Sequence, residues 1–130
     1  MRIVVSAAVI EDHGRYFVTR RHRGTHLEGY WEFPGGKCEG DESIEACLRR
    51  ELKEELGAEV IVGAEVFTVA HEYPDREVEL HFLACTFLNA PVPLLGQEMR
   101  WVPREELRSL PFPPADDELI ARLTATDSHA

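Results

Sequence analysis

One uninterrupted helical segment, Ser43 to Leu56, constrains the fold of this chain more than any other stretch. It contains no glycine or proline and is rich in Glu, Leu, Arg and Ala, residues that favour α-helix. Gly57 follows directly and suits the left-handed conformation in which many helices end. Asp41 or Ser43 could cap the start by accepting a hydrogen bond from a free backbone amide. We therefore predict a helix here.

This helix is expected to carry an apolar stripe that becomes acidic toward its end. At about 100° per residue, one azimuth collects three apolar residues and then three carboxylates: Ile44, Cys47, Leu48, Glu51, Glu54 and Glu55. A solvated face would explain such charges, but Glu42, Arg49 and Lys53 already supply a polar face on the opposite side. Carboxylates in line with a core repel one another and lose hydration, so they need a cation. Hard oxygen ligands of this kind suit Mg²⁺ or Mn²⁺.

The length and charge of the chain narrow its class. Its 130 residues fit one domain, taken as 1–130 with a frayed tail at 126–130. A hydrophobic content of 44% favours a globular fold over disorder. The net charge of -10 argues against binding of a nucleic-acid polymer, which normally needs a basic surface. A single nucleotide remains compatible, because divalent metal can bridge its phosphates to acidic residues.

The cysteines and the N-terminus indicate a cytoplasmic protein without a membrane anchor. Three cysteines, an odd number without CxxC spacing, suggest reduced thiols. Arg2 precedes an apolar run from Ile3 to Ile10, but Glu11 and Asp12 end that run, so a strand is expected and not a signal peptide. No stretch approaches the ~20 apolar residues of a membrane span. Monomer and homodimer both remain open.

Strand and helix patterns alternate along the rest of the chain. Runs rich in β-branched and aromatic residues predict strands at Ile3–Ile10, Tyr16–Thr19, Glu59–Ala70 (one strand or a bent pair broken near Gly63), Glu77–Leu88 and Met99–Val102. A turn is expected at His71–Arg76, and helices opening at Pro103–Leu107 and covering Asp116–Thr124. Strands on both sides of the central helix predict a mixed α/β sandwich.

Two segments beside the helix could meet a ligand. The loop from Arg20 to Tyr30 is the one basic patch in an acidic chain. It is either a solvated loop or a place where Arg21 and His26 meet phosphate or base. Gly35 and Gly36 are expected to allow positive-φ backbone and close approach of a ligand, with carbonyls that can bind a hard cation.

The central segment resembles the signature of a known enzyme family. The box of the Nudix hydrolases is matched by Gly36, five residues, Glu42, seven residues, Arg50-Glu51-Leu52, one residue, Glu54-Glu55, one residue and Gly57. Further strings resemble the MutT-like branch: TRR at 19–21, WEFPGGK at 31–37, YPDR at 73–76, GQ at 96–97, WVP at 101–103 and PPAD at 113–116. The resemblance implies the Nudix fold, an α/β (α+β) arrangement with a mixed β-sheet sandwiched between α-helices. It also implies a Mg²⁺-dependent hydrolase, with Mn²⁺ as an alternative, that converts nucleoside triphosphates to the monophosphate and pyrophosphate.

The resemblance assigns roles within the box and leaves the general base open. It places metal on one carbonyl and three carboxylates: Gly35, Glu51, Glu54 and Glu55. Arg50 is the residue that orients a catalytic Glu. The base that takes a proton from water is Glu51, Glu55 or a group outside the box. Where relatives often carry Glu before the GQ pair, this chain has Leu95, and Glu98 could replace it if the loop bends suitably.

The resemblance also places nucleotide contacts on six residues: Arg21, His26, Phe33, Asp75, Arg76 and Asp116. Phe33 could stack on the base. Members specialised for 8-oxo-dGTP commonly have Asn where this chain has Asp116, whose ionised carboxylate would accept from an exocyclic amino group; a helix N-cap role is equally open. We therefore expect nucleotide-pool sanitising linked to DNA repair, with 8-oxo-dGTP or cytidine-type triphosphates as substrate. The alternatives are hydrolysis of a nucleotide sugar or dinucleotide, and a non-catalytic ligand sensor.

Overall fold

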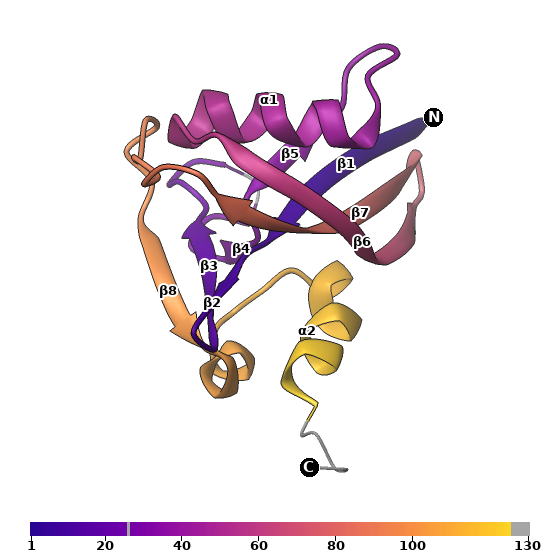
Figure 1. Ribbon diagram of the computed structural model, residues 1–130. Helices are drawn as coiled ribbons and strands as arrows, with labels where there is room; N and C mark the ends of the chain where they lie inside the picture. The colour runs from indigo at the N-terminus through magenta and orange to yellow at the C-terminus, as the bar shows by residue number, and fades with distance from the viewer. Residues whose placement is uncertain (26, 126–130) are drawn as a thin grey trace.

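The strands form two sheets, with helices above and below them (Figure 1). The computed structural model describes residues 1–25 and 27–125. Within them, the first four-stranded sheet has the order β5-β1-β7-β6, formed by Gly35–Lys37, Arg2–Val9, Arg76–Phe87 and Val60–Tyr73. The second consists of β2 (Glu11–Asp12), β3 (Arg15–Arg20), β4 (Trp31–Glu32) and β8 (Met99–Pro103). This arrangement confirms the expected mixed α/β sandwich.

Strand β1 separates two apolar cores. It pairs in parallel with β7 and antiparallel with β5, so it lies inside the sheet. Ala7 and Val9 point into a core shared with Phe82 of β7. Ala8 and the following Ile10 point into the other core, which also contains the buried leucines of the central helix. A strand that is buried on both faces reads as a continuous apolar run, as the segment from Ile3 to Ile10 does.

Helix α1 (Ile44–Leu56) covers one face of the first sheet, as predicted (Figure 1). The Ser43 hydroxyl accepts a hydrogen bond from the Ala46 amide at 3.0 Å, so Ser43 is the N-terminal cap. At the other end, Gly57 adopts the left-handed conformation with φ 60°, and its amide donates to the Leu52 and Lys53 carbonyls. Local sequence signals therefore set both ends of this helix.

The expected change of this helix from apolar to acidic is wrong. The buried stripe continues to the end of α1 through Leu52 and Leu56. Each lies one position beyond a carboxylate, Glu51 or Glu55, so the core stripe and the acidic edge run side by side. The carboxylates also differ in exposure, since the Glu51 side chain is 13% exposed and that of Glu54 is 59% exposed.

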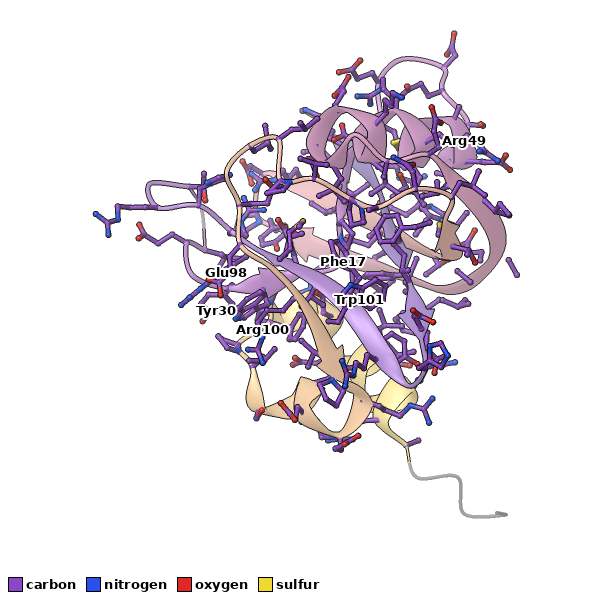
Figure 2. All side chains as sticks on the ribbon, turned by 60° about the vertical axis from the view of Figure 1, so that its left-hand side comes forward. Phe17, Tyr30, Arg49, Glu98, Arg100 and Trp101 are labelled. Atoms are coloured by element: carbon purple, nitrogen blue, oxygen red, sulfur yellow. A yellow bond between two sulfur atoms is a disulfide. The ribbon has the colours of Figure 1, made fainter. Side chains whose placement is uncertain are left out.

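The C-terminal part of the chain covers the opposite side of the first sheet (Figure 1). Helix α2 (Asp117–Thr124) confirms the last expected helix. The segment after Pro103 instead forms a 3₁₀ helix, η1 (Arg104–Ser109), and a second short one, η2 (Pro114–Asp116), leads into α2. In the second sheet, Phe17 of β3 meets Trp101 of β8 edge to face, with 5.3 Å between ring centroids (Figure 2). This side-chain contact adds to the backbone pairing between β3 and β8.

The long hairpin β6–β7 differs from the expected turn. Strand β6 continues through residues 71–73, so the turn is limited to Pro74 and Asp75. Cross-strand pairing with β7 overrides the local turn preference of this segment. The break expected near Gly63 is a shift of register between Val62 and Phe67 inside one continuous strand.

Two of the three cysteines are joined, against the expectation of reduced thiols. Cys38 and Cys47 form a disulfide, with 5.2 Å between their Cα atoms. Spacing along the chain did not reveal this pair, because the fold brings the end of β5 against α1. Cys85 is a free thiol, and its burial raises its pKa to about 11. No helix in the described part of the chain is long and apolar enough to cross a membrane. The tail expected to fray, 126–130, lies outside the described residues.

Candidate active site

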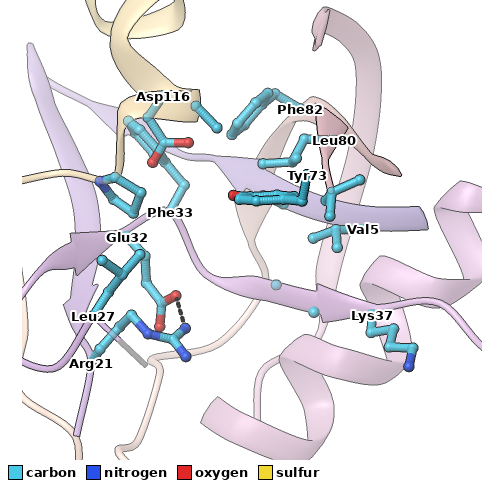
Figure 3. Close-up of a pocket in the computed structure, with 16 residues that line it drawn as sticks. Val5, Arg21, Leu27, Glu32, Phe33, Lys37, Tyr73, Leu80, Phe82 and Asp116 are labelled. Carbon is cyan, nitrogen blue, oxygen red and sulfur yellow. Dashed lines mark hydrogen bonds and ion pairs between the residues drawn. The ribbon is translucent and has the colours of Figure 1, made fainter. Parts of the chain in front are cut away.

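A cavity of about 340 Å³ lies over the first sheet, beside the loops that follow β3 and β4 (Figure 3). Its floor is apolar and comes from alternate residues of β1 and β7: Val5, Ala7, Val78, Leu80 and Phe82. Its edge is polar or charged: Arg21, Glu32, Lys37, Tyr73 and Asp116. Val78, Leu80 and Phe82 share one side of β7 because alternate residues of a strand face the same way. An apolar floor with a few polar groups is typical of a small-molecule site.

Phe33 forms part of the cavity wall and is held by two other rings. It is buried, stacks on Phe112 with 5.4 Å between centroids, and meets Phe82 edge to face at 6.0 Å. Phe33, which we expect to contact the base, lines this cavity. Because Phe112 already covers one face of the ring, any stacking on a ligand must use the other face.

Asp116 lies at the polar edge of the cavity and is only 5% exposed (Figure 3). Burial raises its pKa to about 7, and the negative charges of Glu32 and Asp117 contribute. Although Asp116 occupies the N-cap position of α2, its side chain makes no capping hydrogen bond. The alternative of a capping side chain is therefore wrong, and the carboxyl is available to the cavity.

Glu32 is a cavity residue that the sequence reasoning missed. It extends from β4 toward Arg21, whose Nη1 donates to its carboxylate at 2.9 Å (Figure 3). Burial raises the pKa of Glu32, and the Arg21 charge only partly offsets this effect. The sequence signal for Glu32 is a carboxylate placed between two aromatic residues, Trp31 and Phe33. Both aromatic side chains are buried, so the carboxylate between them is partly desolvated.

Arg50 connects the carboxylates of α1 with the preceding loop. Its Nη1 donates to Glu51 at 3.1 Å and to Glu54 at 3.2 Å. Its Nε donates to Glu42 at 2.6 Å, and its Nη2 donates to the Lys37 carbonyl at 3.1 Å. The hydrogen bond from Arg50 lowers the pKa of Glu42 to about 2. The sequence predicted that Glu42 lies on a solvated face, and this is wrong. Glu42 instead holds the Arg50 guanidinium in place.

Glu55 is the helix carboxylate whose ionised form is most disfavoured. Burial raises its pKa well above the ordinary value of a Glu. The negative charges of Glu51, Glu32 and Glu54 raise it further. The negative charge of Glu32 at the cavity edge thus acts on Glu55 together with the charges of the helix carboxylates.

The paired glycines are required for close packing and not for positive φ, contrary to expectation. Gly35 and Gly36 lie in β5, and neither belongs to the glycines with positive φ. A Cβ on Gly35 would lie 2.0 Å from the Ser6 carbonyl oxygen, and a Cβ on Gly36 would lie 2.3 Å from the Glu51 carboxylate. The sequence predicted close approach, but its partners are β1 and Glu51.

The remaining candidate contacts fall in different places. Asp75 and Arg76 do not line the cavity; they pair with each other at 3.3 Å on the β6–β7 turn. The Arg76 guanidinium lies 5.0 Å from the Tyr73 ring centre, and Tyr73 does line the cavity. Glu98 accepts a hydrogen bond from Arg20 at 3.3 Å. His26 lies outside the described residues.

The helix carboxylates have the chemistry of a divalent-metal site. They offer only oxygen donors and concentrate negative charge, which suits Mg²⁺ or Mn²⁺. Among residues 1–25 and 27–125, no three Asp, Glu, His or Cys side chains are gathered as a metal would require. Arg50 instead balances Glu51 and Glu54 by donating to both. The donor set therefore fits a hard cation that competes with Arg50 for the same oxygens.

Comparison with known proteins agrees with this fold and identifies the family. The model of the NUDIX domain matches residues 5–122. An 8-oxo-dGTP diphosphatase of Haemophilus influenzae is 37% identical over 124 residues, covering 93% of this chain and 90% of the relative. A CTP pyrophosphohydrolase of Escherichia coli is 36% identical over 124 residues, covering 95% and 92%. A solved MutT structure of Aliivibrio salmonicida or Vibrio cholerae origin has a TM-score of 0.80 at 31% identity, covering 95% and 97%. The chain belongs to the NUDIX domain family, where it is similar to the MutT-like members.

Proposed function

We propose that this chain is a single-domain, Mg²⁺- or Mn²⁺-dependent pyrophosphohydrolase that converts a nucleoside triphosphate and water to the monophosphate and pyrophosphate. The observation that carries the proposal is that Gly35 and Gly36 of β5 line the cavity while Gly36 also lies against the Glu51 carboxylate, so the cavity and the acidic edge of α1 are neighbours. An apolar cavity suits a base and sugar, whereas the acidic helix edge suits metal-bound phosphates. The names of the two relatives, an 8-oxo-dGTP diphosphatase and a CTP pyrophosphohydrolase, support this reaction class.

The box residues divide the chemistry between them. Glu51, Glu54 and the Gly35 carbonyl would hold the metal. A bound Mg²⁺ or Mn²⁺ neutralises phosphate charge and lowers the pKa of water. Arg50 positions the carboxylates, as its hydrogen bonds to Glu51 and Glu54 support. Glu55 is the general base, because a raised pKa brings a carboxylate closer to neutral pH, where a base accepts a proton most effectively.

The polar residues at the edge of the cavity would select the base through hydrogen bonds. An ionised Asp116 only accepts hydrogen bonds, but with a pKa of about 7 a large fraction of it is protonated at neutral pH. A protonated carboxyl presents one donor and one acceptor, as an Asn amide does. This equivalence supports both 8-oxo-dGTP and cytidine-type triphosphates as substrates. Glu32 and Arg21 add an acceptor and a cation nearby.

A substrate panel tests the function. We expect pyrophosphate release with Mg²⁺, abolished by EDTA, from at least one of 8-oxo-dGTP, dGTP, dCTP, 5-methyl-dCTP and CTP. The measurement is kcat/KM for each compound, with pyrophosphate and phosphate quantified separately and ADP-ribose as a non-triphosphate comparison. Turnover of ADP-ribose alone would contradict the proposed substrate class while leaving the box chemistry intact. No turnover of any compound would contradict the proposed reaction.

The loop carboxylate Glu42 offers a second test of the box. Glu42→Gln should lower kcat about tenfold, because a partner that orients an active-site group typically contributes this much. The charge-assisted bond to Arg50 is weakened while the shape is kept. Glu39→Gln, an exposed carboxylate in the same loop, is the matched control and should keep its activity. Equal kcat values for both variants would show that Arg50 is positioned without Glu42.

The proposed setting is the cytoplasm, where the protein would act on free nucleotides before they enter DNA. The net charge of -10 supports a free nucleotide over a nucleic-acid polymer as substrate. A sanitising role linked to DNA repair follows if an oxidised or otherwise modified nucleotide has the highest kcat/KM among the compounds tested.

A further inference from the structure

The Cys38–Cys47 disulfide joins the two elements that carry the proposed metal ligands. Cys38 directly follows β5, which contains Gly35 and Gly36, and Cys47 lies one helical turn before Glu51 in α1. The chain between the two cysteines includes Glu42, the residue that holds Arg50. The bond therefore closes a short loop around the groups that set the geometry of the box.

The two sulfur atoms differ in access and in environment. Cys38 is partly exposed, whereas Cys47 is completely buried, so an incoming thiolate can reach only Cys38. The Ser6 hydroxyl donates a hydrogen bond to Cys47 Sγ at 3.1 Å. Cys47 also lies close to the N-terminus of α1, where the helix dipole favours negative charge. Cys47 is thus equipped to leave as a thiolate when the bond is attacked.

We propose that Cys38 and Cys47 form a reversible redox site that controls metal binding by the box, an inference that rests on the proposed function for its effect on hydrolysis. A dithiol reductant attacks Cys38 Sγ, the Sγ–Sγ bond breaks, and Cys47 leaves as a thiolate that takes up a proton. The second thiol of the reductant then attacks the mixed disulfide and releases Cys38. The reductant becomes a disulfide, and the protein gains two electrons and two protons. In a reducing compartment such a bond is transient, which is consistent with a regulatory role.

Reduction of the disulfide raises the entropic cost of ordering the loop when the metal binds. In the oxidised protein, the disulfide restricts the loop that carries Glu42 before any metal binds. In the reduced protein, the loop must be ordered when the metal binds, so affinity falls. We expect a roughly tenfold higher dissociation constant for Mn²⁺ in the reduced form. Hydrolysis at limiting metal should fall with it and recover at saturating metal.

The test uses the wild-type protein in both redox states. Dithiothreitol is titrated under native conditions, and alkylation followed by mass measurement should show Cys38 and Cys47 becoming free while near-ultraviolet circular dichroism stays native. Mn²⁺ binding is then measured by electron paramagnetic resonance for each state, independently of any substrate. Failure of dithiothreitol to open the bond in the folded protein, or equal Mn²⁺ dissociation constants in the two states, would overturn the proposal.

Variants separate this inference from the proposed function. Cys38→Ser/Cys47→Ser should bind Mn²⁺ like the reduced wild type whether or not reductant is present. Cys85→Ala removes the remaining thiol and should keep the difference between the two states. A redox-dependent Mn²⁺ affinity without hydrolysis of any triphosphate would contradict the proposed function and leave the redox site standing. Hydrolysis with redox-independent Mn²⁺ affinity would do the reverse.

Discussion

Glu55→Gln is expected to lower kcat by about a thousandfold, within the range observed for loss of a general base. Gln keeps the shape of Glu but cannot take a proton from water. The same change should raise the melting temperature at pH 9. Burial and the charges of Glu51, Glu32 and Glu54 disfavour ionised Glu55 in the folded state. Above its folded pKa that penalty is fully present in the wild type and absent in the variant.

Steady-state kinetics with Mg²⁺ and thermal unfolding at pH 9 measure the two effects. Glu45→Gln is the matched control, since Glu45 lies on the same helix, is exposed and pairs only with Arg49 in the described interactions. It should change neither quantity appreciably. If Glu55→Gln retained most of the wild-type kcat, Glu55 would not be the base, and Glu51→Gln would be the next variant to measure.

Asp116→Asn is expected to remove a large part of the pH dependence of stability. The folded pKa of about 7 is higher than the ordinary value of 3.8, so the folded state binds the proton more tightly than the unfolded state. Wild-type stability should therefore fall as pH rises from about 4 to about 7 and level off above. The variant lacks this titration and should be more stable than wild type at pH 8 by roughly 2 to 4 kcal/mol.

Urea unfolding at pH 4.5 and pH 8 measures this difference, with Asp41→Asn, an exposed Asp, as the control. The same variant tests base reading, because Asn presents a donor and an acceptor at every pH. The kcat/KM ratio between 8-oxo-dGTP and dCTP should become independent of pH between 6 and 8. An unchanged stability profile would contradict the burial of an ionisable Asp116. An unchanged substrate ratio would separate Asp116 from base selection.

Local signals were sufficient for the two ends of the central helix, although not for the arrangement of its faces. Ser43 and Gly57 mark the ends of α1 through short-range hydrogen bonds and backbone conformation, both of which are encoded by neighbouring residues. Val78, Leu80 and Phe82 likewise share one side of β7 because of strand geometry alone, which is also encoded locally. The position of Arg50 beside Glu51 and Glu54 follows from the same short range.

Features that depend on contacts between distant segments were not predictable in this way. The pairing of Cys38 with Cys47 depends on the packing of β5 against α1, which brings the two residues together. Glu32 and Tyr73 line the cavity because β4 and the β6–β7 hairpin meet there, which no local pattern records. The paired glycines were recognised as special, but the neighbour that requires Gly36, the Glu51 carboxylate, is set by tertiary packing.

The place of β1 has a consequence for how the protein is made. Although β1 is synthesised well before β7, it lies inside the sheet, and its Arg2 pairs with Glu77 of β7. Leu83 and Cys85 of β7 belong to the apolar core that also contains the buried leucines of α1. Nascent chains that end before β7 thus contain the complete box sequence but lack the strand that pairs with β1 and that completes the core beneath α1. We expect such chains to depend on chaperones, because folding must wait for this distant pairing.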